Sequence, residues 1–534
     1  MIEVEVHQQL RAFLRDQGEP YWHHHLTMAR LVARALRLER SALIQAGATS
    51  SYHGRYRLSY LMPLLLWPKA AILVAPEEIQ QRLLMVEIPR LRQWIQTHKA
   101  IRKGDRFPSE DFQGLLLTSP QDWLSDRFQG EGRFPAGIPT IFDGVDDLES
   151  WARTQLTTQI QTQDWDELML ACPGEIDLIR DTRVQLTRSI FQHPPNPYDR
   201  YLIDSQEQEI LEHLYGALRR KTSGHPTGKK SAASPATDPE PQAWNHLPSV
   251  WQRFGHAIAT HHDLLWTGLA RRQGQFTLFA SPVEVGSRLE AIWQQQPVVL
   301  IGGALDPDSD AKTYRQRLSL GDLTSLKFSP DRQHEMIQLY LPDRLPLPNT
   351  PQFQTVMMQE IRSLLGATNT ANQGLTVVLV EDTPMKAQVG AVLAAEYGSR
   401  VQVEKTCLDE HGILVTGWEF WRMHQLVLPA PNLLIMATLP IPSLEDPLVA
   451  GRVNYYKQLR QDWFRLYLLP ETLSEMQRAI APIRESQGVL ALLDNRVNHR
   501  SYGQKILNAL SPLARINYVD ASLFQHLEEI SMRD

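Results

Sequence analysis

Short apolar runs that alternate with helix-patterned stretches constrain the fold of this chain more than any other feature. A first set of runs covers residues 42–45, 71–75, 114–118, 139–143, 276–280 and 298–301, and a second set covers residues 375–380, 413–416, 433–437, 489–494 and 516–519. Wholly apolar strands separated by helices are typical of parallel sheets that helices cover on both faces. We therefore expect an α/β protein with two parallel-sheet domains.

The region between the two sets has a different pattern. Residues 151–275 show helical periodicity with few strand signals, so we expect a helical insertion there. Within it, residues 221–243 lack aromatic and large aliphatic side chains and are predicted to form a disordered loop. The expected first domain is then residues 1–150, completed by about 276–330, and the expected second domain is residues 335–534.

Composition excludes several classes of protein. Apolar residues make up 43% and charged residues 21% of the 534 residues, as in ordinary globular proteins. Two cysteines, Cys172 and Cys407, are too few for a disulfide framework, a zinc ribbon or a four-thiolate iron–sulfur cluster. The net charge of −6 does not indicate a nucleic-acid ligand, although local grooves rather than net charge decide such binding.

The apolar runs also bear on membranes and compartment. The longest run, residues 58–67, is too short to cross a bilayer. Residues 1–14 lack the apolar core of a signal peptide. We therefore expect a cytoplasmic protein that does not associate with membranes.

The segment after the first apolar run is the first that can be compared with a known sequence motif. Residues 45–63 read QAGATSSYHGRYRLSYLMP. Their flanks resemble the strand–loop–helix phosphate loop of DinG/XPD-type superfamily 2 helicases. Tyr56 stands where that family has the phosphate-binding Lys, and Arg57 stands where it has the Mg²⁺-binding hydroxyl. The resemblance implies a nucleotide contact at Gly47, with Arg55 or Arg57 as a substitute phosphate ligand.

Residues 140–153, TIFDGVDDLESWAR, resemble the metal-binding box of the same family. Asp143 matches the Asp that holds Mg²⁺, so the resemblance implies a residual metal ligand there. Gly144 replaces the Glu that positions the attacking water, and glycine has no group that could orient a water or take a proton. ATP and Mg²⁺ are thus implied as ligands, but hydrolysis is expected to be weak. No cysteine stands near Lys103, where iron–sulfur members place their first, so no such cluster is expected.

The resemblance continues through the second half of the chain. The similar segments are residues 279–285, 297–305, 375–382, 412–425, 439–448, 469–484 and 488–503. Gln477 and Arg484 are retained from the family's arginine motif, whereas Ala481 replaces its transition-state Arg. Trp421 and Arg422 are candidates for nucleic-acid contact, with core packing as the alternative for Trp421.

Several polar groups have a structural explanation beside the functional one. Three consecutive histidines, His23, His24 and His25, point in different directions and cannot all face one ion. Asp146 and Asp147 are expected to be an acidic pair at a helix N-terminus. Arg484 is expected to make structural hydrogen bonds between the two sheet domains, and the basic groups at 219–221 and 229–230 are expected to be solvated.

Three functions stay open at this point. The first is a pseudo-helicase that binds single-stranded DNA or another nucleic acid with little or no ATPase activity. The second is an active ATP-dependent 5′-to-3′ DNA helicase in repair or replication. The third is a scaffold for a protein partner, with the old cleft filled by Tyr56, Arg422 and Met423. The joint replacement of phosphate-loop, water-positioning and arginine residues favours the first.

Overall fold

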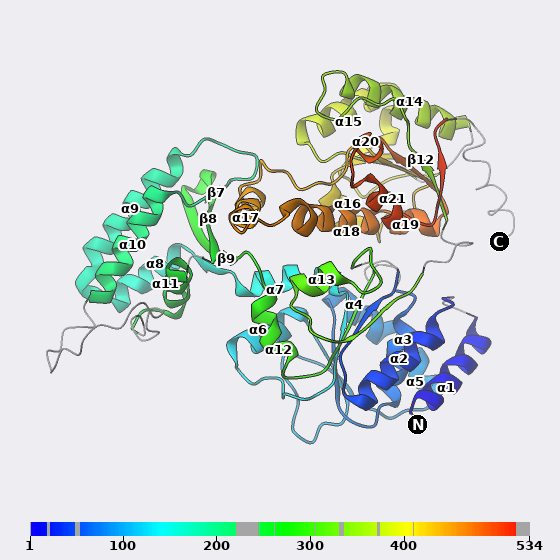
Figure 1. The fold of residues 1–534 in the computed structure, drawn as a ribbon, viewed down its shortest axis with the longest axis horizontal. Helices are drawn as coiled ribbons and strands as arrows, with labels where there is room; N and C mark the ends of the chain where they lie inside the picture. Colours follow the sequence, from blue (N-terminus) through cyan, green and yellow to red (C-terminus); the bar gives the residue numbers. More distant parts are fainter. Residues whose placement is uncertain are drawn as a thin grey trace. The chain divides into compact units, whose positions relative to one another are not determined.

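The structure, a computed structural model, describes residues 2–18, 22–47, 54–220, 244, 246–260, 262–303, 305–329, 336–370, 374–409 and 411–519. The chain divides into two compact units (Figure 1). The larger unit consists of Met1–Glu149, Gly286–Ile441 and Leu468–Asp534, and the smaller unit consists of Ser150–Val285 and Pro442–Tyr467. The predicted disordered loop, residues 221–243, lies outside the described residues.

The larger unit contains two parallel sheets, so the α/β prediction with two parallel-sheet domains is confirmed. The first sheet has the order β11-β1-β10-β5-β2-β4-β3. Its strands are β1 (Ala42–Gln45), β2 (Ala71–Val74), β3 (Ile101–Lys103), β4 (Leu115–Thr118), β5 (Thr140–Asp143), β10 (Val298–Gly302) and β11 (Thr324–Lys327). Every neighbouring pair in this sheet is parallel.

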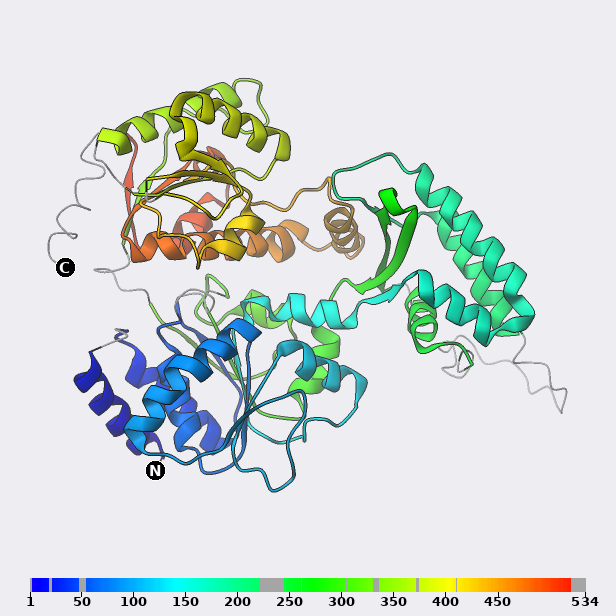
Figure 2. The same cartoon turned by 180° about the vertical axis from the view of Figure 1, so that it is seen from behind.

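Helices cover both faces of the first sheet because its central strands are apolar on both sides. The helices are α1 (Ile2–Gln17), α2 (His25–Leu38), α3 (Arg57–Leu66), α4 (Glu77–Arg82), α5 (Ile88–Ile95), α6 (Pro120–Gln129), α12 (Gly286–Trp293) and α13 (Lys312–Arg317), with a π-helical turn at Leu83–Glu87 between α4 and α5. In Figure 2, α1, α2, α3 and α5 lie on one side of the sheet, and α6 and α12 lie on the other. The apolar faces of α1, α2, α3 and α5 share one core with the strands.

The second sheet has the order β14-β15-β13-β16-β17-β12-β18, again with parallel neighbours throughout. Its strands are β12 (Ile337–Tyr340), β13 (Thr376–Leu379), β14 (Val401–Val403), β15 (Ile413–Thr416), β16 (Leu433–Met436), β17 (Val489–Leu492) and β18 (Leu513–Ile516). Its helices are α14 (Phe353–Thr370), α15 (Thr383–Tyr397), α16 (Trp418–His424), α18 (Leu469–Ala479), α19 (Ala481–Glu485), α20 (Arg496–His499) and α21 (Gly503–Ala509).

The smaller unit corrects one expectation. Residues 276–280 were expected to join a parallel sheet, but they lie in β9 of an antiparallel sheet with the order β6-β9-β8-β7. Its strands are β6 (Thr158–Ile160), β7 (Arg200–Leu202), β8 (Asp263–Ala270) and β9 (Gln275–Pro282). The insertion therefore contains helices and a β-sheet in which β8 and β9 form a hairpin. The prediction was wrong because an apolar run alone does not show whether a strand is parallel or antiparallel to its neighbour.

Helices pack around this antiparallel sheet. They are α8 (Thr162–Ala171), α9 (Ile176–Gln192), α10 (Ser205–Arg220), α11 (Ser249–Thr260) and α17 (Pro447–Gln458), and α7 (Leu148–Leu156) begins where the larger unit ends. The core includes the buried rings of Trp165, Trp251 and Phe254. Gly451 of α17 lies so close to Leu264 and Leu202 that a side chain there would collide with them. Among the described residues, no helix combines the length and the apolar composition needed to cross a bilayer.

Candidate functional site

The candidate site lies at the carboxyl ends of three adjacent strands in the first sheet. In the order β1-β10-β5, these strands end at Gln45, Gly302 and Asp143. Loops that leave the carboxyl edge of a parallel sheet meet beside one another, and ligands of such sheets bind there. The loop after β1 leads into α3, so the first turn of α3 lies next to Asp143.

The carboxylate of Asp143 is fully buried and bound by protein groups on both oxygens. Tyr56 donates its hydroxyl hydrogen to Oδ1 over 2.7 Å, and Tyr60 donates to Oδ2 over 2.7 Å. The Nε of Arg57 lies 3.4 Å from Oδ2 and supplies the positive charge. The side chain that the sequence predicted as a metal ligand is thus held by two tyrosines and an arginine.

Helical geometry explains why these donors converge. Tyr56 is the residue before the first turn of α3, and Tyr60 follows it by four positions, which places both on one face of the helix. Arg57 packs closely under Gly54, where any side chain would overlap its guanidinium. Its Nη1 also lies 3.8 Å from a carboxylate oxygen of Glu87. Tyr56, Arg57 and Tyr60 are all buried, so the site is a closed part of the core.

Burial shapes the ionisation of the three donors. It raises the pKa of Tyr56 and of Tyr60 well above the usual tyrosine value, and the negative charge of Asp143 raises both further. Burial is the largest single influence on the pKa of Arg57 and lowers it, but Asp143, Tyr60, Tyr56 and Glu87 together outweigh burial, so that the pKa is raised. The tyrosines therefore stay neutral and donate, while Arg57 stays charged and balances the carboxylate.

This arrangement does not fit a Mg²⁺ ion on Asp143. Mg²⁺ requires near-octahedral oxygen ligands and keeps several waters. Both oxygens of Asp143 accept hydrogen bonds from Tyr56 and Tyr60, and the nearest charge beside them is the cation of Arg57. A divalent ion would have to displace these donors and lie beside a buried guanidinium, which like-charge repulsion opposes.

The other predicted nucleotide contacts lie apart from this cluster. Gly47 has a positive φ of 81°, and its N–H donates to the carbonyl of Gly303 over 2.9 Å, so it ties the end of β1 to the turn after β10. Arg55 forms a 2.5 Å ion pair with Glu485. Both arginines predicted as substitute phosphate ligands thus form ion pairs with protein carboxylates, Arg57 with Asp143 and Arg55 with Glu485.

A second group of polar side chains lies at the turn after β5. Its aspartates, Asp146 and Asp147, were singled out from the sequence, but their partners were not. Gly144 adopts a φ of 89°, which L residues with side chains rarely accept. Asp146, expected as part of an acidic pair at a helix start, accepts the N–H of Gly303 at 2.9 and 3.1 Å. Burial raises the pKa of Asp146, although the charge of Arg478 acts in the opposite direction.

Arg478 is a residue that the sequence analysis missed. Its Nη2 donates to the carbonyl of Asp146 over 3.0 Å, and its Nη1 lies 2.7 Å from a carboxylate oxygen of Asp147. Its place directly after the retained Gln477 is the signal that could have identified it. Within the larger unit, Arg478 therefore joins α18 to the turn after β5.

The predicted residues of the second half contact their own part of the fold. Trp421 is buried and donates its ring N–H to the carbonyl of Ala479 over 3.1 Å, which favours core packing over base stacking. Arg422 is exposed, with Nη1 3.5 Å from Glu475. Gln477 donates to the carbonyl of Ala509.

Arg484 makes structural hydrogen bonds within the second sheet domain, whereas structural bonds between the two sheet domains were expected of it. It donates to the carbonyls of Leu510 and Ser511 over 2.8 and 3.0 Å. Those carbonyls follow the end of α21, so the guanidinium satisfies acceptors that a helix terminus leaves open. Among the described contacts of Asp143, none comes from Trp421, Arg422, Gln477 or Arg484.

The consecutive histidines have separate partners. The Nε2 of His24 lies 3.0 Å from the carbonyl of Ser329, and its ring stacks on Phe328. The Nδ1 of His25 lies 2.8 Å from the hydroxyl of Ser59. These separate hydrogen bonds agree with a structural use of the two rings.

Comparison with known proteins gives sequence relatives with two printed activities, a DNA helicase and an exonuclease. No family model matches the chain. The chain is 26% identical to the ATP-dependent DNA helicase YoaA of Haemophilus influenzae over 259 residues, which is 45% of this chain and 40% of that protein. It is 22% identical to the 3′-5′ exonuclease DinG of Bacillus subtilis over 378 residues, which is 64% of this chain and 41% of that protein. The matches thus span about two fifths of the length of these relatives.

Solved structures with a similar fold extend the likeness to nearly the whole chain. Xpd4 of S. tokodaii superposes with a TM-score of 0.55 at 14% identity, covering 93% of this chain and all of that one. A second XPD helicase superposes with a TM-score of 0.56 at 11% identity, with the same coverage. At such identities the likeness concerns the fold.

Proposed function

The chain is related to the DinG/XPD-type superfamily 2 helicases, and we propose that it is a pseudo-helicase that binds nucleic acid with little or no ATPase activity. The helicase-type fold and the helicase relatives support the nucleic-acid ligand. We further propose that the chain acts in the cytoplasm, where its nucleic-acid ligand is available.

One observation carries the proposed loss of hydrolysis. Asp143 is the residue that matches the Mg²⁺-holding Asp, and Tyr56, Arg57 and Tyr60 occupy both of its oxygens. Phosphoryl transfer depends on a metal that neutralises phosphate charge and on a group that positions the attacking water. Here Asp143, at the position of the metal ligand, is already bonded to protein groups, and Gly144 stands at the position of the Glu that orients the water.

Steady-state ATP hydrolysis tests the proposal. Purified chain would be assayed with Mg²⁺ and ATP, with and without single-stranded DNA, beside an active DinG-type helicase as the positive control. We expect turnover below about 0.1 s⁻¹, against roughly 1–100 s⁻¹ for phosphoryl-transfer enzymes such as kinases. Faster turnover that disappears in Asp143→Ala would establish the alternative, an active ATP-dependent DNA helicase.

The nucleic-acid half of the proposal needs a separate measurement. Fluorescence anisotropy with a labelled single-stranded DNA, repeated over a series of salt concentrations, gives both affinity and salt slope. A strand held through Z phosphates gives a slope near −0.7Z in log K against log salt. Absence of binding at low salt would overturn the proposal.

A protein scaffold is the second candidate, and an exposed apolar surface supports it. Met423, Leu426 and Val427 are 66%, 49% and 71% exposed at and beyond the end of α16. Apolar side chains grouped on a surface often mark a protein contact. Two results together would favour this function: the chain does not bind DNA, and the double substitution Met423→Ser/Val427→Ser abolishes its binding to a protein partner.

A further inference from the structure

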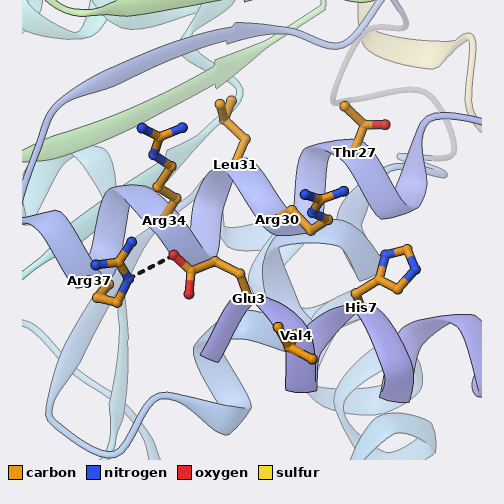
Figure 3. Close-up of a pocket in the computed structure, with 8 residues that line it drawn as sticks. All are labelled: Glu3, Val4, His7, Thr27, Arg30, Leu31, Arg34 and Arg37. Carbon is orange, nitrogen blue, oxygen red and sulfur yellow. Dashed lines mark hydrogen bonds and ion pairs between the residues drawn. The ribbon is translucent and has the colours of Figure 1, made fainter. Parts of the chain in front are cut away.

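A basic groove runs between α1 and α2, and none of its lining residues belongs to the Asp143 cluster. Its lining residues are Glu3, Val4, His7, Thr27, Arg30, Leu31, Arg34 and Arg37, and it encloses ≈ 630 Å³ (Figure 3). The inner faces of both helices are buried in the core of the first sheet domain. The groove is therefore formed by the outer faces of two well-anchored helices.

Polar donors follow one line along α2. Thr27, Arg30, Arg34 and Arg37 are separated by three, four and three positions, the spacing that places residues on one helix face. Successive arginines thus lie about one helical turn apart, at a pitch of roughly 5.4 Å. A row of charges fits a linear polyanion better than one compact anion.

The charges of this row are only partly balanced. Glu3 of α1 forms a 2.7 Å ion pair with Nε of Arg37. Within the described part of the chain, Arg30 and Arg34 have no ion-pair partner, and the Nδ1 of His7 is buried without a hydrogen-bond partner. Two guanidinium groups are thus available to an incoming anion.

The chemistry of the lining selects the kind of anion. Guanidinium forks bind phosphate oxygens in pairs, and a hydroxyl such as that of Thr27 adds another donor. Apart from His7, the lining has no aromatic ring on which a base could stack, so the groove suits the backbone of a strand rather than its bases. With a net charge of −6 for the whole chain, such a local basic surface is also where a polyanion would be drawn.

We propose that the α1–α2 groove binds the phosphate backbone of a nucleic-acid strand, with Arg30 and Arg34 each contacting a phosphate. The inference rests on the proposed nucleic-acid-binding function and gives it a site that does not depend on the helicase motifs. Glu3 limits the affinity because it holds Arg37 in an ion pair.

Charge variants with opposite expected effects test this site. Arg30→Gln/Arg34→Gln removes the two unpaired charges, Glu3→Gln releases Arg37, and Arg106→Gln/Arg288→Gln removes two exposed charges that do not line the groove. All four chains, including the wild type, would be titrated against a labelled 20-nucleotide single strand over a salt series. Thermal melting would show that each variant is folded, as expected for exposed side chains.

We expect Arg30→Gln/Arg34→Gln to weaken binding about tenfold or more at low salt, and to reduce the magnitude of the salt slope by about 1.4, twice 0.7. Glu3→Gln should bind more tightly than the wild type, and the control pair should change the slope much less. Equal effects of the groove and control variants, with a wild type that binds, would overturn the site and leave the proposed function intact. A wild type that does not bind would overturn both.

An acidic peptide is the other anion that arginines attract, and polyglutamate serves as its probe. If Arg30→Gln/Arg34→Gln loses polyglutamate binding but keeps the wild-type affinity for the strand, the groove is a peptide site and the proposal is wrong. If the groove variant loses the strand while polyglutamate competes only weakly with it, the phosphate assignment is supported.

Discussion

Asp143 is a buried carboxylate whose stability depends on its neighbours. An ionised group inside a protein is tolerated only when it is paired and hydrogen-bonded. Arg57 supplies the opposite charge, and the hydroxyls of Tyr56 and Tyr60 supply the hydrogen bonds. At this position, a residue type associated with catalysis in the related helicases is used to stabilise the fold.

Removal of either tyrosine hydroxyl should therefore destabilise the chain. We expect Tyr56→Phe and Tyr60→Phe each to lower the free energy of unfolding by about 1–3 kcal/mol, because a buried acceptor loses its donor while the ring still fills the space. Urea denaturation measures the change. Tyr518→Phe is the matched control, since Tyr518 is 60% exposed and should be neutral to within about 0.5 kcal/mol.

The same tyrosines give the prediction a pH dependence. Their pKa values are raised in the folded state, so the folded chain holds these protons more tightly than the unfolded chain does. Their contribution is fully present below the ordinary tyrosine pKa of about 10 and is lost as the pH rises above it. The double variant Tyr56→Phe/Tyr60→Phe should thus lose less stability than the wild type between about pH 9 and 11. Parallel pH curves for the two chains would contradict the burial of these hydroxyls beside the charge of Asp143.

At the scale of elements, the sequence predicted the most apolar parallel strands, but it gave no apolar run for β3, β11, β12 or β14 and did not reveal the antiparallel sheet. Strands such as β2 and β13 are buried on both faces, so their composition alone identifies them. Residues 276–280 have a similar composition, but their partner β8 is mostly half-buried and gave no clear signal. An apolar run reveals that a strand exists, whereas its direction depends on a partner elsewhere in the chain.

The Asp143 cluster was predictable in the same partial way. The motif resemblance placed Tyr56 and Arg57 in the phosphate loop and Asp143 at a strand end, whereas Tyr60 lay in the flank that follows the loop. The spacing of four between Tyr56 and Tyr60 puts both rings on one face of α3, and that spacing was visible. What the sequence could not supply was the placement of α3, which directs this face onto Asp143 at the end of β5.

The contacts of α19 yield a prediction at this scale. Arg484 holds the carbonyls of Leu510 and Ser511 beyond the end of α21. We expect Arg484→Ala to lower the free energy of unfolding by about 1–3 kcal/mol, because carbonyls at a helix end lose charged donors. Chemical denaturation would measure the loss, and strand affinity should stay unchanged.

Arg362→Ala provides the comparison in the same sheet domain. Arg362 pairs with Glu396 at the surface, where solvent screens both charges, so the loss of this pair should change stability little. If Arg484→Ala proves no more destabilising than Arg362→Ala, the structural assignment of Arg484 is wrong.

At the scale of the whole molecule, the two compact units have separate cores. The smaller unit is built from two distant stretches of sequence, Ser150–Val285 and Pro442–Tyr467, around its own antiparallel sheet. Its core includes a Trp165–Trp251 pair with ring centroids 4.8 Å apart, and Trp251 donates its ring N–H to the carbonyl of Asp164. A unit with its own core can unfold as a cooperative step of its own.

We therefore expect two transitions in differential scanning calorimetry, one for each unit. Trp251→Ala should destabilise the smaller unit by about 3–5 kcal/mol and shift one transition only, since it removes a fully buried ring. Leu434→Ala, in the buried strand β16 of the larger unit, should shift the other transition by removing about 2–5 kcal/mol. If each substitution moved both transitions together, the two units would unfold as one. A strand bound at the α1–α2 groove would then raise the stability of the smaller unit as well as that of the larger unit.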